Sequence, residues 1–292
     1  MSSTLVISVK LLKMAFDFHK DRLVYIEHQR LNAVDYVIPF IERTLPVVPG
    51  TDVMEIGCGE GGVLKAFVDK GCTGVGVELS PGKAAKARAL LSKEISSGTV
   101  KIIEKNIYDV DIPEEFPNLF DLIVLKDVIE HIHDQDAIIE KMREFLKPNG
   151  RIFFGFPPWH MPFGGHQQIL KHRTLSKTPY IHLLPTFLYR WLLQITGQPG
   201  EVASLLEIKE TGISIERFER LIRKHGYAME SREYYLINPI YKFKFNLKPR
   251  VQFNLLSKIP FFRNFWTTCM YYVVRKEDLT RRLKEQLRPA PF

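Results

Sequence analysis

The sequence predicts an α/β fold built on a doubly wound, mostly parallel sheet, and three observations support that prediction. Short apolar segments with strand character alternate with amphipathic helical segments along residues 25–156. The helices between the strands are long enough for right-handed crossovers, which place successive strands in parallel. A glycine-rich loop follows the first strand, at the edge of the sheet where open α/β folds bind their ligands.

The elements of this alternation follow in a regular order. The first is a helical pattern over residues 25–44, which Pro46, Pro49 and Gly50 end. Its apolar side comprises Leu31, Val34, Val37, Ile38 and Ile41. Strands are predicted for DVMEI from residue 52, TGVGVEL from 73, VKIIEKN from 100, FDLIVLKD from 120 and RIFFGFP from 151. Helices are predicted for residues 63–69, 81–96 and 134–150, the last closed by Pro148 and Gly150.

Composition and charge restrict the class of protein. The chain has 292 residues, and none of its apolar runs approaches the roughly 18 residues of a membrane-spanning helix. The N-terminus has no signal-peptide cleavage pattern, and the three cysteines lie far apart without a C-x-x-C pair, so we expect a cytoplasmic protein without disulfides. Residues 1–156 carry 19 Lys and Arg against 23 Asp and Glu, whereas residues 157–292 carry 22 against 10. The two halves are therefore expected to have different tasks, unless the basic half is only a solvated face.

The glycine loop has the spacing G-x-G-x-x-G at Gly57, Gly59 and Gly62. Such a loop lets a ligand approach the backbone closely and is typical of dinucleotide sites. Glu55 lies two residues before the first glycine, where a pyrophosphate would be repelled and a cofactor with an ammonium group would be favoured. A second block, FDLIVLKDVIEHIHD, places polar residues at the end of the fourth strand. The two features together favour an adenosine cofactor other than a dinucleotide.

With both segments, the chain resembles the class I S-adenosylmethionine-dependent methyltransferases, in the broad group that includes quinone, lipid and small-molecule methyltransferases. The resemblance covers residues 25–156 well and 213–275 more loosely. It implies one Rossmann-like domain over 1–292, whose seven-stranded sheet ends in an antiparallel edge strand at TTCMYYVVRK. Within it we expect an N-terminal helical cap at 1–50, a lid insertion at 157–212 and a second insertion at 238–266.

The resemblance also implies a set of residues that bind S-adenosylmethionine. The methionine end of the cofactor would contact Glu55, Gly57, Cys58 and Gly59, together with Lys126 and Asp127. Glu78 would accept both ribose hydroxyls, and Leu79 would pack on the adenine. Asn106 and Ile107 stand where this family usually has an Asp followed by a small or apolar residue, so Asn106 departs from the pattern by adding a donor.

Three histidines are candidates for the general base that a hydroxyl acceptor requires. His160 and His166 lie in FPPWHMPFGGHQQ, which leaves the fifth strand toward the cofactor and contains Gly164 and Gly165 as a hinge. His131 belongs to EHIHD, where it could instead hold the loop in shape. No metal site is predicted, because these histidines lack regular ligand spacing and nearby carboxylates.

The acceptor is expected to be a small or amphiphilic molecule that is methylated on oxygen. Residues 234–276 hold eight Lys and Arg, twelve aromatic residues and no Asp or Glu, a composition that suits contact with an anionic membrane, an anionic amphiphile or single-stranded nucleic acid. Two alternatives are a catalytically idle Rossmann-like binding module and an RNA methyltransferase that uses the basic C-terminal half. FPPW resembles the motif of base-amine methyltransferases, but Phe156 cannot accept a hydrogen bond from an amine, which makes nucleic acid an unfavoured partner.

Overall fold

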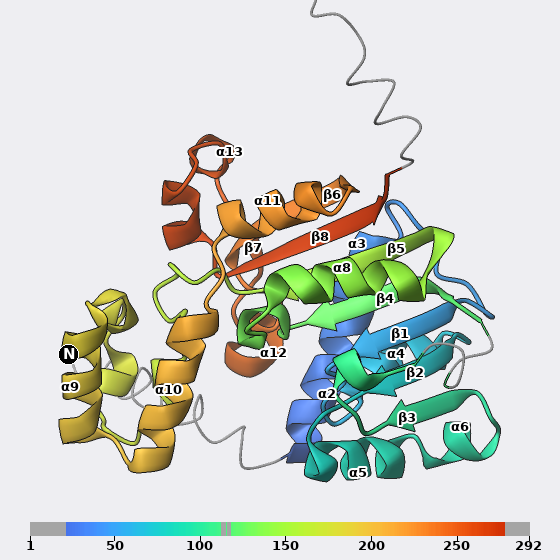
Figure 1. Cartoon of the computed structure of the whole chain (residues 1–292), viewed down its shortest axis with the longest axis horizontal. Helices are drawn as coiled ribbons and strands as arrows, with labels where there is room; N and C mark the ends of the chain where they lie inside the picture. Colours follow the sequence, from blue (N-terminus) through green and yellow to red (C-terminus); the bar gives the residue numbers. More distant parts are fainter. Residues whose placement is uncertain (1–21, 112–114, 116–117, 278–292) are drawn as a thin grey trace, which may run out of the picture.

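The computed structural model describes residues 22–111, 115 and 118–277, and its centre is one eight-stranded sheet with the order β3-β2-β1-β4-β5-β8-β6-β7 (Figure 1). Five strands run in parallel, β1 (Asp52–Ile56), β2 (Thr73–Val77), β3 (Val100–Ile103), β4 (Phe120–Lys126) and β5 (Leu146–Phe156). Every strand predicted from the sequence in this half is present. The alternation of apolar segments therefore predicted the parallel part of the sheet correctly.

The remaining strands differ from the prediction in position and number. β8 (Cys269–Lys276) is antiparallel, as predicted, but it lies between β5 and β6 (Tyr227–Ile237). The predicted edge position is therefore wrong. The edge beyond β6 is taken by β7 (Arg250–Val251), a two-residue strand that the second insertion adds and that makes the count eight instead of seven.

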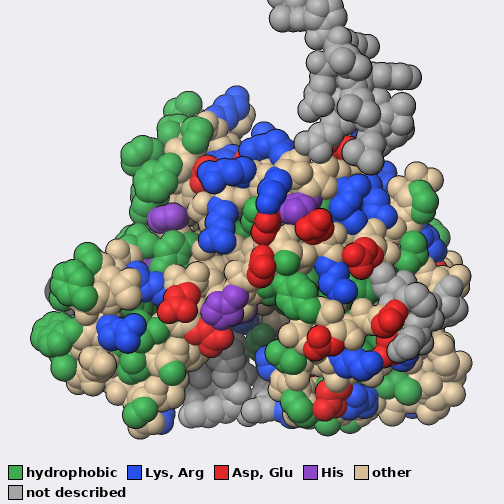
Figure 2. Space-filling model, viewed as in Figure 1, with side chains coloured by type: hydrophobic (Ala, Val, Ile, Leu, Met, Phe, Trp, Pro, Cys, Tyr) green, Lys and Arg blue, Asp and Glu red, His purple; other side chains and the backbone are tan. Residues whose placement is uncertain are grey.

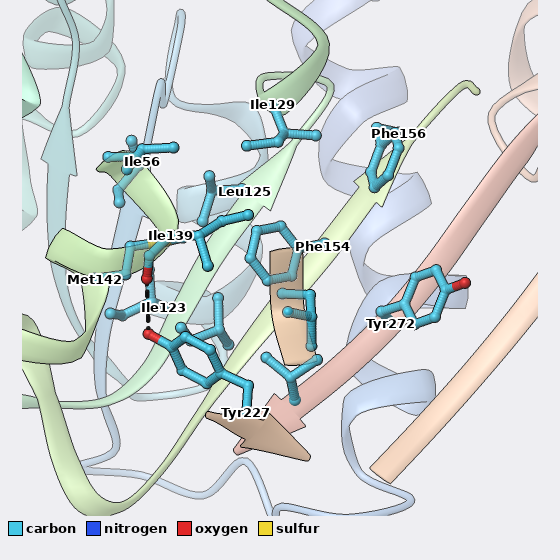
Figure 3. Close-up of a cluster of buried hydrophobic side chains, with 14 of the residues drawn as sticks. Ile56, Ile123, Leu125, Ile129, Ile139, Met142, Phe154, Phe156, Tyr227 and Tyr272 are labelled. Carbon is cyan, nitrogen blue, oxygen red and sulfur yellow. Dashed lines mark hydrogen bonds between the residues drawn. The ribbon is translucent and has the colours of Figure 1, made fainter. Parts of the chain in front are cut away.

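Helices cover both faces of the sheet, because alternate residues of each central strand point to opposite sides. On one face Ile123 and Leu125 join a cluster with α8 (Gln135–Phe145) and α11 (Ile215–Lys224), part of which is drawn in Figure 3. There the hydroxyl of Tyr227 donates to the carbonyl of Ile139 at 3.1 Å. On the other face Leu122 and Val124 pack with the N-terminal helices and with α4 (Gly62–Asp69). The doubly wound prediction is confirmed.

The N-terminal helical segment consists of α2 (Arg22–Asn32), a π-helical turn η1 (Ala33–Val37) and α3 (Ile38–Ile41). Ala33, Val37 and Ile41 are buried against the sheet, whereas Val34 is 40% exposed although the 3.6-residue pattern predicted it on the apolar side. A π turn adds a residue to one turn and so rotates the buried face. The rest of the 1–50 cap, residues 1–21, lies outside the described residues.

The other helices before β5 agree with the prediction, except that the one predicted over residues 81–96 is broken into two at Leu91 and another ends early. α5 (Pro81–Leu90) and α6 (Ser92–Ser96) follow β2, and short 3₁₀ turns η2 (Ile107–Asp109) and η3 (Ile129–His131) follow β3 and β4. The helix predicted to close at Pro148 ends at Phe145, and residue 146 already belongs to β5. Proline disfavours helical geometry in the residue before it, which accounts for the earlier end.

Residues 157–212 form a small subassembly beside the sheet (Figure 1). It contains three 3₁₀ turns, η4 (Gln167–Ile169), η5 (Leu175–Lys177) and η6 (Ile181–Leu183), and two helices, α9 (Thr186–Thr196) and α10 (Pro199–Thr211). Its own apolar cluster comprises Leu170, Ile181, Tyr189, Leu193, Leu205 and Ile208. The insertion therefore has a packed interior of its own.

The second insertion contains α12 (Tyr241–Phe245), β7, α13 (Asn254–Ser257) and η7 (Phe262–Trp266). A buried ion-pair network attaches it to the core: the Arg263 guanidinium donates to Glu216 at 2.8 Å and to Glu219 at 2.9 Å. The hydroxyls of Tyr234 and Tyr272 also donate to Glu219. Across residues 22–277, as far as they are described, no helix is both long enough and apolar enough to cross a bilayer.

Candidate functional site

The candidate site lies where β1, β2 and β4 end, and its floor is the glycine loop. Gly57 and Gly59 have φ angles of 69° and 57°, in the left-handed region that glycine adopts without strain. A Cβ atom on Gly57 would lie 2.6 Å from a Val128 methyl, so this position also needs glycine for close packing. A Cβ atom on Gly59 would meet nothing within 4 Å, which shows that the space beside this glycine is open.

Glu78 follows the last residue of β2 and fixes the shape of this loop. Its two carboxylate oxygens accept hydrogen bonds from the backbone N–H of Gly59 at 2.9 Å and of Ser80 at 2.8 Å. The side chain is buried. Each carboxylate oxygen has a second lone pair, so Glu78 can hold the loop and still accept from ribose hydroxyls.

Glu55 is the buried acid of the site. The side chain is 3% exposed, and its Oε2 atom has no hydrogen-bond partner among the described residues. Burial raises the pKa of the Glu55 carboxyl well above its usual range. Such an unsatisfied buried oxygen is costly unless a ligand completes it, and an ammonium group is a suitable partner. Cys58 beside it is also buried, and burial raises the pKa of its thiol.

The expected adenine side of the site is more open. Leu79 is 67% exposed and so offers an apolar surface at the end of β2. Ile107 is buried, and Asn106 precedes the turn η2, where its side-chain oxygen accepts from the backbone N–H of Tyr108 at 3.2 Å. The side-chain oxygen of Asn106 is therefore used within the turn. Its amide N–H group is what Asn106 can offer to a ligand.

Lys126 and Asp127 form an ion pair at the carboxyl end of β4. Lys126 is buried; burial opposes its charge, but the Asp127 carboxylate more than compensates, so the pKa of Lys126 is raised. Asp127 has a φ angle of 57°, which is strained for a residue with a side chain, and its N–H donates to the carbonyl of Gly155 at 2.7 Å. Strained backbone of this kind tends to occur where a side chain must be aimed at a ligand.

The structure brings His131 and His166 together although they come from different segments. Their rings lie 5.1 Å apart in an edge-to-face arrangement. Burial lowers the pKa of both imidazoles, and it lowers that of His166 to about 4, with His131 contributing in the same direction. His166 also has a φ angle of 54°, the second strained residue of this region. Both imidazoles are therefore neutral at pH 7 and able to accept a proton.

Glu130 lies beside this pair and was not singled out from the sequence. It is buried, and its two carboxylate oxygens have no hydrogen-bond partner within the described part of the chain. Burial raises its pKa well above the usual range, and the nearby Asp127 adds to the shift. Each of three residues, Glu130, His131 and His166, offers one possible ligand atom, and these atoms lie within 4.8 Å of one another. Such a group of side chains could hold a metal ion. The argument that these histidines lack a nearby carboxylate is therefore wrong.

The third candidate base, His160, lies elsewhere. Its ring packs against Phe261 and Phe265 of the second insertion, with centroids 5.3 and 5.5 Å away. Burial lowers its pKa, and Glu216 partly offsets the effect. The structure thus groups His131 with His166 and places His160 at the contact between the two insertions.

Two further groups at the site carried no sequence motif. Tyr25 of α2 accepts a hydrogen bond from Gln29 at 2.8 Å, and burial together with the charge of Asp127 raises the pKa of its hydroxyl. Lys244 of α12 lies with its ammonium group 5.3 Å from the Tyr25 ring centroid. The only available signal was the density of cations and aromatic residues in the second insertion, which does not distinguish one lysine from another.

These features fit an adenosine cofactor with an amino-acid end. The open space at Gly59, the unsatisfied oxygen of Glu55 and the carboxylate of Glu78 supply a cradle, a partner for an ammonium group and acceptors for hydroxyls. His131 and His166 lie near Asp127 at the end of β4. The arrangement can bind such a cofactor on one side and remove a proton from a second molecule on the other.

Comparison with known proteins also indicates a methyltransferase. A family model described as a methyltransferase domain matches residues 25–177. Over 105 residues the chain is 32% identical to ubiquinone biosynthesis O-methyltransferases of Pseudomonas syringae pv. tomato and Pseudomonas putida. Each match covers 36% of this chain and 44% of the relative, so the chain aligns with less than half the length of these curated proteins.

Solved structures share the fold at low sequence identity. A Haemonchus contortus phosphoethanolamine N-methyltransferase 2 in complex with S-adenosyl-L-methionine superposes with a TM-score of 0.51 and 17% identity, covering 82% of this chain and 52% of that one. A plantazolicin methyltransferase in complex with a triazolic desmethylPZN analogue and SAH (S-adenosylhomocysteine) gives a TM-score of 0.51 and 13% identity, covering 91% of this chain and 90% of that one. These likenesses show the Rossmann-like fold.

Proposed function

The chain belongs to the methyltransferase domain family, and from that premise we propose that it transfers the methyl group of S-adenosylmethionine to an oxygen of a small or amphiphilic acceptor. One observation supports this most strongly: the neutral pair His131 and His166 lies close enough to Asp127, which follows the end of β4, for the carboxylate charge to act on both imidazoles. The named relatives act on oxygen in ubiquinone biosynthesis, which supports the same class of chemistry.

In this proposal the chain's own residues hold the cofactor, accept a proton and cover the acceptor. Glu55, the glycine loop and Glu78 hold the cofactor, with Leu79, Asn106 and Ile107 on its adenine side and Lys126 and Asp127 at its methionine side. Bound S-adenosylmethionine supplies a methyl group already activated on a sulfonium sulfur, so the protein mainly positions the partners and excludes water. His166, with His131 beside it, accepts the proton that leaves the acceptor hydroxyl as the oxygen attacks.

The lid is the third part of the proposal. Residues 157–212 carry His166, and residues 238–266 carry Lys244, so both insertions contribute to the acceptor side. Gly165 packs closely on His182, where a Cβ atom would lie 2.2 Å from the His182 Cβ, and this contact fixes the backbone next to His166. We infer that the two insertions together cover the acceptor during transfer.

We further propose that the outer surfaces of the two insertions touch an anionic membrane. On α9, Phe187, Trp191 and Ile195 form a stripe at helical spacing and are 56–76% exposed. Near α13, the exposed apolar residues are Phe253, Leu255, Phe262 and Trp266. Figure 2 shows hydrophobic side chains on the left margin over α9 and at the upper left over α13, with basic side chains between.

Charge supports this choice of partner. Neither α9 nor residues 234–276 contain an Asp or Glu, whereas Arg190 and Lys258 are exposed beside the apolar side chains. Exposed aromatic residues next to cations suit the interface of an anionic bilayer, where each cation adds about 1 kcal/mol. An amphiphilic acceptor would be reached from such a surface.

Binding of the cofactor product tests the proposed function. Titration of the protein with SAH should raise its melting temperature, because a ligand that binds only the folded state stabilises it. No shift at millimolar ligand would leave the alternative, an idle Rossmann-like binding module, as the better description. A mass-spectrometric screen of native extract with S-adenosylmethionine then identifies the acceptor class, and methylation confined to RNA would contradict the small-molecule proposal.

A further inference from the structure

A cavity of about 510 Å³ lies where β6 meets the second insertion, at the end of the sheet opposite β3 (Figure 1). We call it the edge groove, and its lining includes Arg232, Tyr234, Gln252, Lys258 and Arg263. None of the residues that line it belongs to the candidate site, and β5 and β8 separate β6 from β4 in the sheet. Its volume is typical of a site for a small ligand.

Hydrogen bonds between buried groups hold the floor of the edge groove. The backbone N–H of Gln252 donates to the carbonyl of Tyr234 at 2.8 Å, and its side-chain amide donates to the carbonyl of Arg263 at 3.0 Å. The Arg263 guanidinium donates to the hydroxyl of Tyr234 at 3.0 Å and to Glu219 at 2.9 Å. Because these contacts join β6 to η7 and to the residue after β7, the groove has its shape before a ligand binds.

The acidic groups around the edge groove are already paired. Arg263 binds Glu216 at 2.8 Å and Glu219 at 2.9 Å, so these three side chains add little free charge. Glu233, the acid of the lining, forms an ion pair with Arg43 at 2.6 Å. Among the described residues that line the groove, no carboxylate is therefore left unpaired to repel an anion.

Two cations of the lining remain available to a ligand. Arg232 is exposed, and its guanidinium lies 3.6 Å from Glu219, which is too long for a hydrogen bond. Lys258 is exposed at the end of α13, and its ammonium forms no ion pair within the described part of the chain. A guanidinium can bind two phosphate oxygens at once, and an ammonium adds a point charge beside them. The groove therefore suits a phosphate group.

Apolar side chains lie beside these cations. Val251 belongs to the lining, and Phe253 and Leu255 flank Asn254 in the sequence, which also lines the groove. All three apolar side chains are more than half exposed. Figure 2 shows hydrophobic side chains gathered over α13 with basic side chains next to them. Cations beside an exposed apolar surface suit a ligand that has an anionic head and an apolar chain.

We propose that the edge groove binds one molecule of an anionic phospholipid. Arg232 and Lys258 bind its phosphate. The acyl chains lie over Val251, Phe253 and Leu255. The assignment rests on the membrane contact proposed above and is independent of methyl transfer. It replaces a diffuse attraction between the second insertion and an anionic surface with a defined site for one headgroup, which would fix how the protein is oriented on a bilayer.

A short-chain lipid tests the assignment without a bilayer. The probes are dihexanoylphosphatidylglycerol below its critical micelle concentration and glycerol 3-phosphate, which offers a phosphate without acyl chains. Isothermal titration calorimetry measures their dissociation constants. We expect the wild type to bind the lipid about tenfold or more tightly than glycerol 3-phosphate, because the chains add apolar contact. Leu255→Ser should weaken binding of the lipid several-fold and leave binding of glycerol 3-phosphate unchanged.

Substitution of the two cations tests the phosphate contact. Arg232→Gln and Lys258→Gln should each weaken binding of both probes by about fivefold or more, because the phosphate loses a charged partner. Arg250→Gln is the matched control: Arg250 is exposed on β7, and its loss changes the net charge by the same amount, but it does not line the groove. This variant should leave both dissociation constants nearly unchanged. The melting temperature of each variant shows that it is folded.

Three results would overturn the assignment. Equal weakening by Arg232→Gln and Arg250→Gln would show only a diffuse attraction. Glycerol 3-phosphate that binds as tightly as the lipid would identify a site for soluble phosphate esters, and the absence of binding of either probe would leave the groove without this ligand. Failure of the membrane contact is read separately from cosedimentation with vesicles, and failure of methyl transfer from the absence of a thermal shift with SAH.

Discussion

The cofactor side and the acceptor side of this site are constructed differently. On the cofactor side, Glu55, the glycine loop and Glu78 lie within 24 residues of sequence, and backbone amides fix them: Gly59 and Ser80 both donate to Glu78. On the acceptor side, His131 and His166 come from separate segments and meet only through packing, and so do Tyr25 and Lys244. In the proposed function, a strand-end motif therefore holds the cofactor, while groups brought together by long-range packing face the acceptor. The two functions should therefore be separable by mutation.

The substitution His166→Ala is expected to separate cofactor binding from methyl transfer most clearly. We expect turnover to fall roughly 100-fold or more, because the candidate proton acceptor is lost. SAH affinity should stay unchanged, since the residues that hold the cofactor are untouched. Steady-state kinetics on an identified acceptor and thermal titration with SAH measure the two effects.

His160→Ala is the control for that variant, since His160 packs against Phe261 and Phe265 and not against His131. It should reduce turnover much less than His166→Ala does. The reverse order of effects would show that the base belongs to the contact between the insertions, and equal full activity in both variants would leave His131 as the remaining candidate.

The opposite separation is expected from Glu78→Ala. It removes an acceptor of cofactor hydroxyls and also the group that holds the N–H of Gly59 and Ser80. Charge-assisted hydrogen bonds contribute about 1.5–3 kcal/mol, so SAH affinity should fall by roughly one to two orders of magnitude. Most of the thermal shift caused by SAH should disappear.

If Glu78→Ala binds SAH normally, the assignment of the end of β2 to the ribose is wrong. If His166→Ala lowers SAH affinity together with turnover in a folded variant, the two sides are not independent.

A smaller effect is expected from pH on the stability of the lid. Burial lowers the pKa of His182 from its ordinary value of 6.5 to about 4. The unfolded chain therefore binds a proton between pH 6.5 and about 4 that the folded chain does not, and stability falls as pH decreases through that window. His182 is fully buried, so the loss can approach 3 kcal/mol, or several degrees of melting temperature.

His182→Gln tests the assignment, since Gln does not titrate. The variant should lose less stability than the wild type between pH 7 and pH 5, whatever its stability at pH 7. Equal slopes of melting temperature against pH would show that other groups, His166 among them, account for the dependence.

The smallest expected effect concerns the outer surface of the insertions. Cosedimentation with anionic vesicles should be observed at low salt and lost at 1 M salt, because the screening length falls from about 10 Å at 0.1 M to about 3 Å. Phe187→Ser should weaken it several-fold, and Val48→Ser, which replaces another exposed apolar residue, should not. If the protein does not cosediment with vesicles at low salt, the exposed apolar residues of the two insertions are only a solvated face. A water-soluble acceptor would then be favoured.

The sequence predicted features that have a local signal better than features that depend on contacts between distant segments. The parallel strands were predictable because a short apolar segment between helices is a local signal, and the glycine spacing that marks the candidate cofactor loop is local too. The pairing of His131 with His166 and the approach of Lys244 depend on how two insertions fold back on the sheet, and nothing in the local sequence encodes that. Val34 shows a smaller failure of the same kind, since one π-helical turn rotated the face that periodicity had predicted. The position of β8 inside the sheet is likewise a matter of topology.

That position has a consequence for the order in which the protein is made. β6 pairs only with β7 and β8 in the described sheet, so its attachment to the five parallel strands depends entirely on β8. A nascent chain that has left the ribosome as far as residue 237 can assemble β1 to β5 in sequence, but β6 must wait for residues 269–276. Both insertions are synthesised before that strand emerges. Protease treatment of released chains that end before residue 269 and of released chains with the full sequence should therefore show β6 protected only in the longer ones.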